Sequence, residues 1–173
     1  MAYGSESVNS NFWWLLVLII AIIIIIIIVV AVSNSDDNGG GGGNKDVNFI
    51  IPHIDGDQEV PPSEAKGSGK GTGVLSADRN SFYYNIVVKH KCDITSAHFH
   101  FGAKNENGPV AKTLAFRNKH EGVWTASGVW SSSDASEPLD STAVNELLAN
   151  RVYVNIHSRK HPKGAIRGQV LVE

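Results

Sequence analysis

The sequence predicts an all-β domain, an antiparallel sandwich or Greek-key barrel with one short helix, carried behind a single transmembrane helix. Three observations lead to this prediction. Residues 12–32 form one uncharged apolar run, residues 33–45 are rich in glycine and small polar residues, and residues 46–173 contain short segments of alternating apolar and polar residues. Such alternation is typical of β-strands, and turn-forming residues separate the segments.

The apolar run from Phe12 to Val32 consists mostly of Ile, Leu and Val. As a helix rising about 1.5 Å per residue it would span about 30 Å, the thickness of the hydrocarbon core of a bilayer. Trp13 and Trp14 at one end suit the headgroup level. A cleaved signal peptide is the alternative, but residues 1–11 contain no basic residue and the run is long for such a peptide. We expect an uncleaved single-pass anchor.

The linker that follows, residues 33–45, contains five consecutive glycines at Gly39–Gly43. A stretch of this composition is a flexible coil, so it would hold the domain just clear of the headgroups. No Lys or Arg flanks the apolar run closely, and the positive-inside rule therefore leaves the membrane orientation open.

The clearest strand of the domain lies at Ser81–Lys89, where four apolar side chains share one face: Phe82, Tyr84, Ile86 and Val88. Because side chains alternate between the two faces of a strand, this face is expected to be buried. The same reasoning predicts strands at Val47–Ile54, Gly71–Leu75, Thr95–Phe101, Val110–Phe116, Gly122–Trp130, Arg151–His157 and Ala165–Val172.

One short helix is expected before the last two strands. Asp140 or Ser141 can cap its N-terminus, because their side-chain oxygens accept hydrogen bonds from the first free backbone N–H groups. Val144, Leu147 and Leu148 follow at helical spacing and give the helix an apolar stripe.

The charge composition excludes several function classes. The formal net charge is −2 and no basic block stands out, so nucleic-acid binding through a charged patch is not expected. No Ser/His/Asp arrangement and no phosphate-binding loop is recognisable in the sequence. A non-catalytic role is therefore expected ahead of an enzymatic one.

Three histidines are candidate metal ligands. His98 and His100 lie two residues apart on one predicted strand, so they share the face opposite its apolar side chains. His157 also lies opposite the apolar face of its own strand. Histidine is the commonest nitrogen ligand of zinc and copper, and a three-histidine set leaves one coordination position open. A copper or zinc site is one interpretation; solvated or hydrogen-bonded histidines on a sheet surface are the other. His161 is a further candidate ligand, although its place beside Pro162 is typical of a loop.

Two charged residues are candidate binding residues. Arg167 lies opposite the apolar residues of the last strand and is expected to point outward. Glu59 precedes Val60-Pro61-Pro62, where the prolines enforce an extended stretch. Glu59 pairs with a cation, such as Arg167, in one interpretation and is a solvated acid before a rigid turn in the other.

Five motifs in order resemble the CHRD family, named after chordin: Gly56–Pro62, Ala97–Gly102, Asn107–Val110, Tyr153–Ser158 and Pro162–Gln169. The resemblance covers residues 47–172 and departs from the family pattern at Ala165, where an acidic residue is usual. It implies an immunoglobulin-like β-barrel that is distantly similar to copper–zinc superoxide dismutases.

The dismutase analogy would assign His98, His100 and His157 to a metal and Arg167 to the guidance of anions. The bridging His and Asp set that a dismutase needs for zinc is not evident in this sequence, so redox catalysis is not expected. CHRD domains occur in secreted and surface proteins, which implies an extracytoplasmic or outer location.

The leading hypothesis is therefore a membrane-anchored, surface-displayed CHRD domain that acts as a non-catalytic binding or structural module with a protein partner. The alternative is a copper- or zinc-binding protein with redox-related chemistry. A third interpretation is a structural protein of a virion or another membrane-bearing particle.

Overall fold

The computed structural model describes residues 44–173, apart from residue 92 and the side chains of residues 118 and 119. The expected anchor at residues 12–32 and nearly all of the linker lie outside these residues. Within the described part, no helix has the length and apolar character needed to cross a bilayer. The strands are β1 (Val47–Asp55), β2 (Gly67–Leu75), β3 (Ser81–His90), β4 (Ile94–Phe101), β5 (Val110–Thr113), β6 (Arg117–His120), β7 (Val123–Ser131), β8 (Val152–Ser158) and β9 (Ile166–Val172), and the helix is α2 (Ser141–Leu148).

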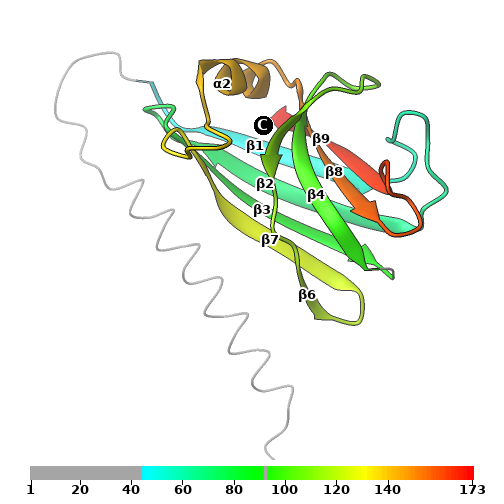
Figure 1. Ribbon diagram of the computed structural model, residues 1–173. Helices are drawn as coiled ribbons and strands as arrows, with labels where there is room; N and C mark the ends of the chain where they lie inside the picture. Colours follow the sequence, from blue (N-terminus) through cyan, green and yellow to red (C-terminus); the bar gives the residue numbers. More distant parts are fainter. Residues whose placement is uncertain (1–43, 92) are drawn as a thin grey trace, which may run out of the picture. The chain divides into compact units, whose positions relative to one another are not determined.

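The strands form one antiparallel sheet in the order β5-β4-β8-β9-β1-β2-β3-β7-β6 (Figure 1). The edge strands β5 and β6 are joined by residues 114–116 alone, and a connection this short spans at most about 14 Å. The two edges of the sheet therefore lie near each other, and the sheet curls into a nearly closed barrel. This confirms the predicted all-β fold in its barrel form, since one continuous sheet replaces the two packed sheets of a sandwich.

The barrel interior is filled by the apolar faces of the strands, as the alternation predicts. Aromatic rings form a connected chain through it, with centroid separations of 5.4 Å for Phe49–Phe82, 5.9 Å for Phe82–Phe99 and 6.1 Å for Phe99–Trp130. All four rings are at most 1% exposed. Burying aromatic side chains of this size supplies much of the hydrophobic stabilisation of a small domain.

Helix α2 packs against one end of the core (Figure 1). Asp140 is its N-cap, because its carboxylate accepts a hydrogen bond from the Ala143 N–H at 2.8 Å. The predicted apolar stripe is right for Val144 and Leu147, which are buried, but wrong for Leu148, which is 39% exposed. Leu148 is the last residue of the helix and points about 100° away from Leu147, so it lies at the edge of the buried face.

Two strand predictions differ from the structure. The predicted strand Val110–Phe116 ends at Thr113, and the chain then reaches the opposite edge of the sheet as β6, which the sequence analysis missed. Strand β2 begins at Gly67 and not at Gly71. The reason is its sequence: residues 67–73 have glycine at the alternate positions that face the interior, so this part of the strand has no apolar side chains for a period-two pattern to reveal.

The glycines of β2 are required by close packing. An ideal Cβ on Gly69 would lie 2.5 Å from Cγ1 of Val88 and 2.7 Å from the carbonyl oxygen of Val87. Both neighbours belong to β3, one of the two strands paired with this part of β2. β2 therefore leaves room in the barrel for the core side chains of its neighbours.

We expect Gly69→Ala to destabilise the domain by about 1–3 kcal/mol, the range typical of an overpacked core. Alanine usually stabilises a strand relative to glycine, so the sign of the effect is informative. Urea unfolding would measure it, with Ser68→Ala as the matched control, since Ser68 is exposed and its loss should change stability by less than about 0.5 kcal/mol. A Gly69→Ala protein as stable as the wild type would contradict the packing described here.

Candidate functional site

The polar motif residues lie together on the outer face of three neighbouring strands, β4, β8 and β9. The register places His98 opposite Asn155, His100 opposite Tyr153, and Asn155 opposite Arg167. Their side chains point away from the apolar core, as alternation along each strand predicts. Alternation along single strands does not reveal which strands are neighbours, and the sheet order shows that these three are.

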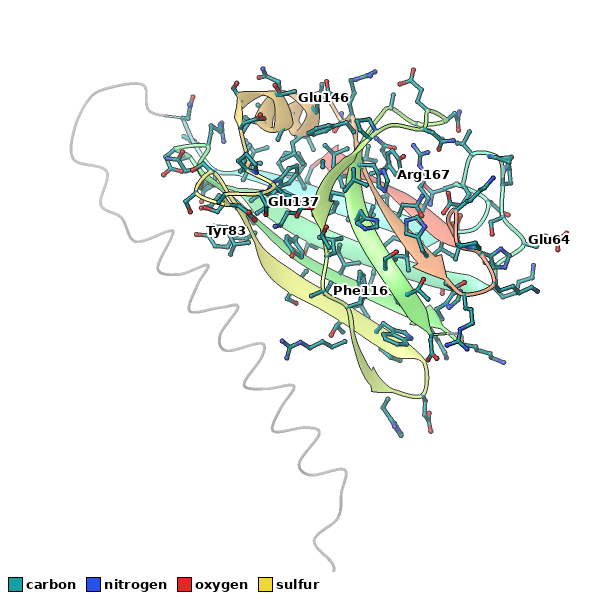
Figure 2. The ribbon with its side chains drawn as sticks, viewed as in Figure 1. Glu64, Tyr83, Phe116, Glu137, Glu146 and Arg167 are labelled. Carbon is teal, nitrogen blue, oxygen red and sulfur yellow. The ribbon has the colours of Figure 1, made fainter. Side chains whose placement is uncertain are left out.

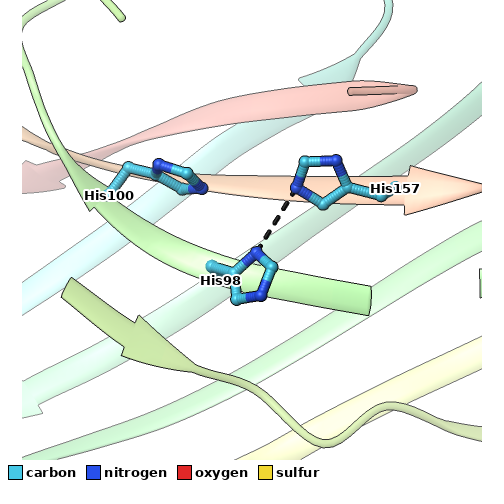
Figure 3. Close-up of side chains that lie close together, drawn as sticks. All are labelled: His98, His100 and His157. Carbon is cyan, nitrogen blue, oxygen red and sulfur yellow. Dashed lines mark hydrogen bonds between the residues drawn. The ribbon is translucent and has the colours of Figure 1, made fainter. Parts of the chain in front are cut away.

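Three imidazoles meet at one point of this face (Figure 3). Nδ1 of His98 lies 3.3 Å from Nε2 of His157, and one nitrogen from each of His98, His100 and His157 lies within 4.8 Å of the others. Tetrahedral bonds of about 2.0–2.1 Å place two ligand nitrogens about 3.3–3.4 Å apart, so the His98–His157 separation already matches a shared zinc ion.

Backbone carbonyls fix which ring nitrogen is free in two of the histidines. Nδ1 of His100 lies 3.0 Å from the carbonyl oxygen of Gly108, and Nδ1 of His157 lies 3.1 Å from that of Pro162. A carbonyl oxygen can only accept, so each Nδ1 carries the proton and each Nε2 keeps its lone pair. Metal-binding histidines are commonly oriented in this way by an outer hydrogen bond.

Nε2 of His100 is the nitrogen whose surroundings fit a metal ion best. It is buried and has no hydrogen-bond partner among the described residues. A buried acceptor without a partner is unfavourable, and a metal ion is one group that would satisfy it. The donor set therefore fits a zinc or copper ion.

The electrostatics favour neutral rings. Burial lowers the pKa of His98, His100 and His157 below the ordinary value of 6.5. The carboxylate of Glu137 opposes part of this effect on the pKa of His98, and the neighbouring His98 lowers the pKa of His157 further. The imidazoles are therefore mainly uncharged at neutral pH, the form in which histidine binds a metal.

Arg167 lies on the predicted face of β9 but is only 1% exposed, because loops cover this face (Figure 2). Its guanidinium carbon lies 3.5 Å from the centroid of the Tyr153 ring, and it donates hydrogen bonds to the Ala103 carbonyl at 2.9 Å and to Oδ1 of Asn107 at 3.4 Å. A guanidinium enclosed in this way is not presented to solvent, so its placement gives no support to the guidance of anions.

Glu59 lies in the connection between β1 and β2 and is 6% exposed, so the solvated-acid interpretation is wrong. Nδ2 of Asn155 donates to its Oε2 at 3.3 Å, while Oε1 has no hydrogen-bond partner among the described residues. The described ion pairs do not include Glu59 with Arg167. Burial raises the pKa of Glu59 to about 7, although the charge of Arg167 and the bond from Asn155 act in the opposite direction.

Three residues of this face were not predicted from the sequence. Tyr153, Asn155 and Gln169 were not selected, although each has the same parity on its strand as His157 or Arg167. The Nε2 of Gln169 donates to the Gly102 carbonyl at 3.0 Å and to the Asn150 carbonyl at 2.8 Å, which joins β9 to two loops.

His161, the further candidate ligand, is not part of the three-histidine set. Its Nδ1 lies 3.4 Å from Oγ of Ser63, so its contact is with the β1–β2 connection. This agrees with the expectation of a loop residue.

A comparison with protein families matches residues 52–170, more than half of the chain, to the CHRD domain. No curated protein matches the chain, and no solved structure matches it. The matched segment contains every residue of the site described above.

We expect Glu59→Gln to change how stability depends on pH. The folded protein raises the pKa of Glu59 from 4.5 to about 7, so the folded state binds this proton more tightly than the unfolded state. The contribution of the protonated carboxyl to the free energy of unfolding is fully present below about pH 4.5 and is lost as the pH rises through about 7. The full loss is about 3 kcal/mol, at about 1.4 kcal/mol for each pH unit between 4.5 and about 7.

Urea unfolding of the wild type and the Glu59→Gln variant between pH 4 and 8.5 would isolate this effect, because all other titrating groups are common to both. The variant should gain stability relative to the wild type as the pH rises. A stability difference that does not vary with pH would show that the carboxyl titrates normally.

Proposed function

The chain belongs to the CHRD domain family, and we propose that its barrel is a transition-metal-binding module held at a membrane surface. The observation that carries the proposal is the unpartnered Nε2 of His100, which faces the same small space as Nδ1 of His98 and Nε2 of His157. The family match supports a binding or structural module, and the histidines supply the chemistry of the binding.

The donor set favours zinc or copper over harder ions. Its three ligand atoms are neutral imidazole nitrogens, whereas calcium and magnesium prefer carboxylate, carbonyl and water oxygens. The ligands come from two hydrogen-bonded strands, β4 and β8, so little ordering is required when an ion binds. This preorganisation supports tight binding.

The proposed role is binding without catalysis. Ion binding alone accounts for the unpartnered Nε2 of His100 and for the free Nε2 lone pairs that backbone carbonyls maintain on His100 and His157. A three-histidine set also leaves a fourth position for water or a ligand from outside the chain, and His98 and His157 are only half-buried. That position is where a protein partner could complete the coordination.

The membrane part of the proposal is supported by the sequence. The apolar run at residues 12–32 has the length of a transmembrane helix, and the glycine-rich residues 33–45 are suited to display a domain at a distance. We propose that the barrel faces the extracytoplasmic or outer side, at a cell surface or on the envelope of a virion.

The metal proposal predicts about one bound ion per chain after the full-length protein, purified in detergent, is loaded with zinc or copper and dialysed. Elemental analysis measures the ion, and titration calorimetry measures its dissociation constant. We expect His157→Ala to weaken binding by more than about 100-fold, because loss of a ligand should exceed the effect of losing an outer-sphere contact. His53→Ala is the matched control, since His53 is exposed and lies outside the set. Absence of both copper and zinc from the loaded wild type would overturn the metal proposal.

The anchor proposal predicts that the full chain sediments with membranes and resists extraction by alkaline carbonate. A chain that lacks residues 12–32 should be released into the soluble fraction, and protease added outside intact cells or particles should reach the domain. A mature chain that begins near Ser33 would show instead that the apolar run is a cleaved signal peptide.

A further inference from the structure

Glu59 lies outside the three-histidine set, but its carboxyl touches the turn that orients one of them. Residues 159–165 connect β8 to β9, and the backbone of Gly164 in this turn lies directly against Glu59. An ideal Cβ on Gly164 would lie 2.7 Å from Oε1 and 2.8 Å from both Cδ and Oε2 of Glu59. Gly164 also has φ +145°, a conformation that favours glycine, so no other residue fits this contact well.

The same turn carries the carbonyl that fixes His157. The Pro162 carbonyl accepts the hydrogen bond of His157 Nδ1 at 3.1 Å. The turn is closed by the Gly164 N–H, which donates to the His161 carbonyl at 3.3 Å, and by the His161 N–H, which donates to the Ser158 carbonyl at 3.0 Å. The position of Pro162 therefore depends on the position of Gly164, two residues along the chain.

The Glu59 carboxyl is held in place from the other side. Asn155 donates to Oε2, and Asn155 lies two residues before His157 on the same face of β8. The Glu59 N–H donates to the Gly56 carbonyl at 3.2 Å, which fixes the backbone at the start of the side chain. The carboxyl is thus a spacer between the strand that bears His157 and the turn that orients it.

From these contacts we propose that Glu59 is a positioning residue for the histidine site. Its side chain supports the β8–β9 turn, and the turn holds the His157 ring in the orientation that leaves Nε2 free to bind a metal ion. This inference rests on the proposed metal-binding function. It assigns the role to the shape of the side chain and not to its charge. The pKa of about 7 agrees with this, since the carboxyl is partly protonated at neutral pH.

The charged groups around Glu59 make a purely electrostatic role the competing explanation. Arg167 on β9 acts on the carboxyl from one side, and an ion at the histidines would act from β4 and β8. A counter-charge role predicts that glutamine fails as a replacement. A seating role predicts that glutamine, which has the same length and still carries an oxygen, succeeds.

The test compares Glu59→Ala and Glu59→Gln in the full-length protein in detergent. Long-range ¹⁵N–¹H correlation spectra of the metal-free protein report the tautomer of His157, and zinc titration reports the dissociation constant. We expect a single Nδ1–H tautomer in the wild type and in Glu59→Gln, and a mixture of tautomers in Glu59→Ala. Zinc binding should weaken by about 10–100-fold in Glu59→Ala, the usual effect of losing an outer-sphere contact, and should change little in Glu59→Gln.

Glu64→Ala is the matched control, because Glu64 is an exposed acid in the same connection between β1 and β2 and should leave both readouts unchanged. If Glu59→Ala does not fold, Glu59→Asp replaces it. The shorter side chain keeps the charge but withdraws the carboxyl from Gly164, so the same change of tautomer and affinity is expected.

The outcomes separate this inference from the function on which it rests. A Glu59→Ala protein with the wild-type tautomer and zinc affinity overturns the positioning role and leaves the metal site intact. If Glu59→Gln and Glu59→Ala lose zinc affinity and the single tautomer to the same extent, the shape of the side chain is not what supports the turn. A wild-type protein that binds neither zinc nor copper overturns the proposed function itself, whatever the tautomers of the variants.

Discussion

The ring of Tyr153 is the contact on which the rest of the site depends. Because β8 lies between β4 and β9, this ring has His100 on one side and Arg167 on the other. His100 stacks on it with centroids 5.0 Å apart, and the guanidinium of Arg167 lies 3.5 Å from the ring centroid. Its hydroxyl accepts a hydrogen bond from the Gly108 N–H at 3.2 Å, next to the carbonyl that orients His100. One side chain thus joins two neighbouring strands to the loop that closes over them.

The motifs along the sequence converge because loops cover the outer face of β4, β8 and β9. Asn107 illustrates this, since its side chain bonds both the Val60 carbonyl and Arg167, which belong to two other motifs. Buried polar atoms normally find hydrogen-bond partners. Within the described residues, the buried side-chain atoms without a partner all lie in this one region: Oε1 of Glu59, Nε2 of His100, Oδ1 of Asn155 and Oε1 of Gln169. Unmet hydrogen-bonding capacity concentrated in one place is expected of a binding site.

Alternation along single strands predicted a large part of this arrangement. It placed Phe82 and Ile86 in the core and assigned His98, His100 and His157 to the opposite face, as the structure has them. It could not predict that β4 and β8 pair, because the pairing joins segments more than fifty residues apart. Alternation also cannot distinguish an outward face that is exposed to solvent from one that loops cover. Loops bury Arg167 and Glu59, and loops have no regular alternation of apolar and polar residues from which their conformation could be predicted.

The burial of Glu59 is difficult to explain as a contribution to stability. A carboxyl whose pKa is raised to about 7 makes folding less favourable at neutral pH, and small domains have only about 5–15 kcal/mol of stability in total. The side chain has hydrogen bonds from Asn155 and from the backbone of Val60, and a glycine backbone lies against it, but together these do not compensate the burial of the charge. A leucine or methionine of similar volume would fill the same space without this penalty. It would not offer an oxygen to Asn155, the residue that lies between the carboxyl and the strand of His157. A side chain of this length with an acceptor oxygen is therefore better explained by the geometry of the histidine site than by the energetics of the barrel.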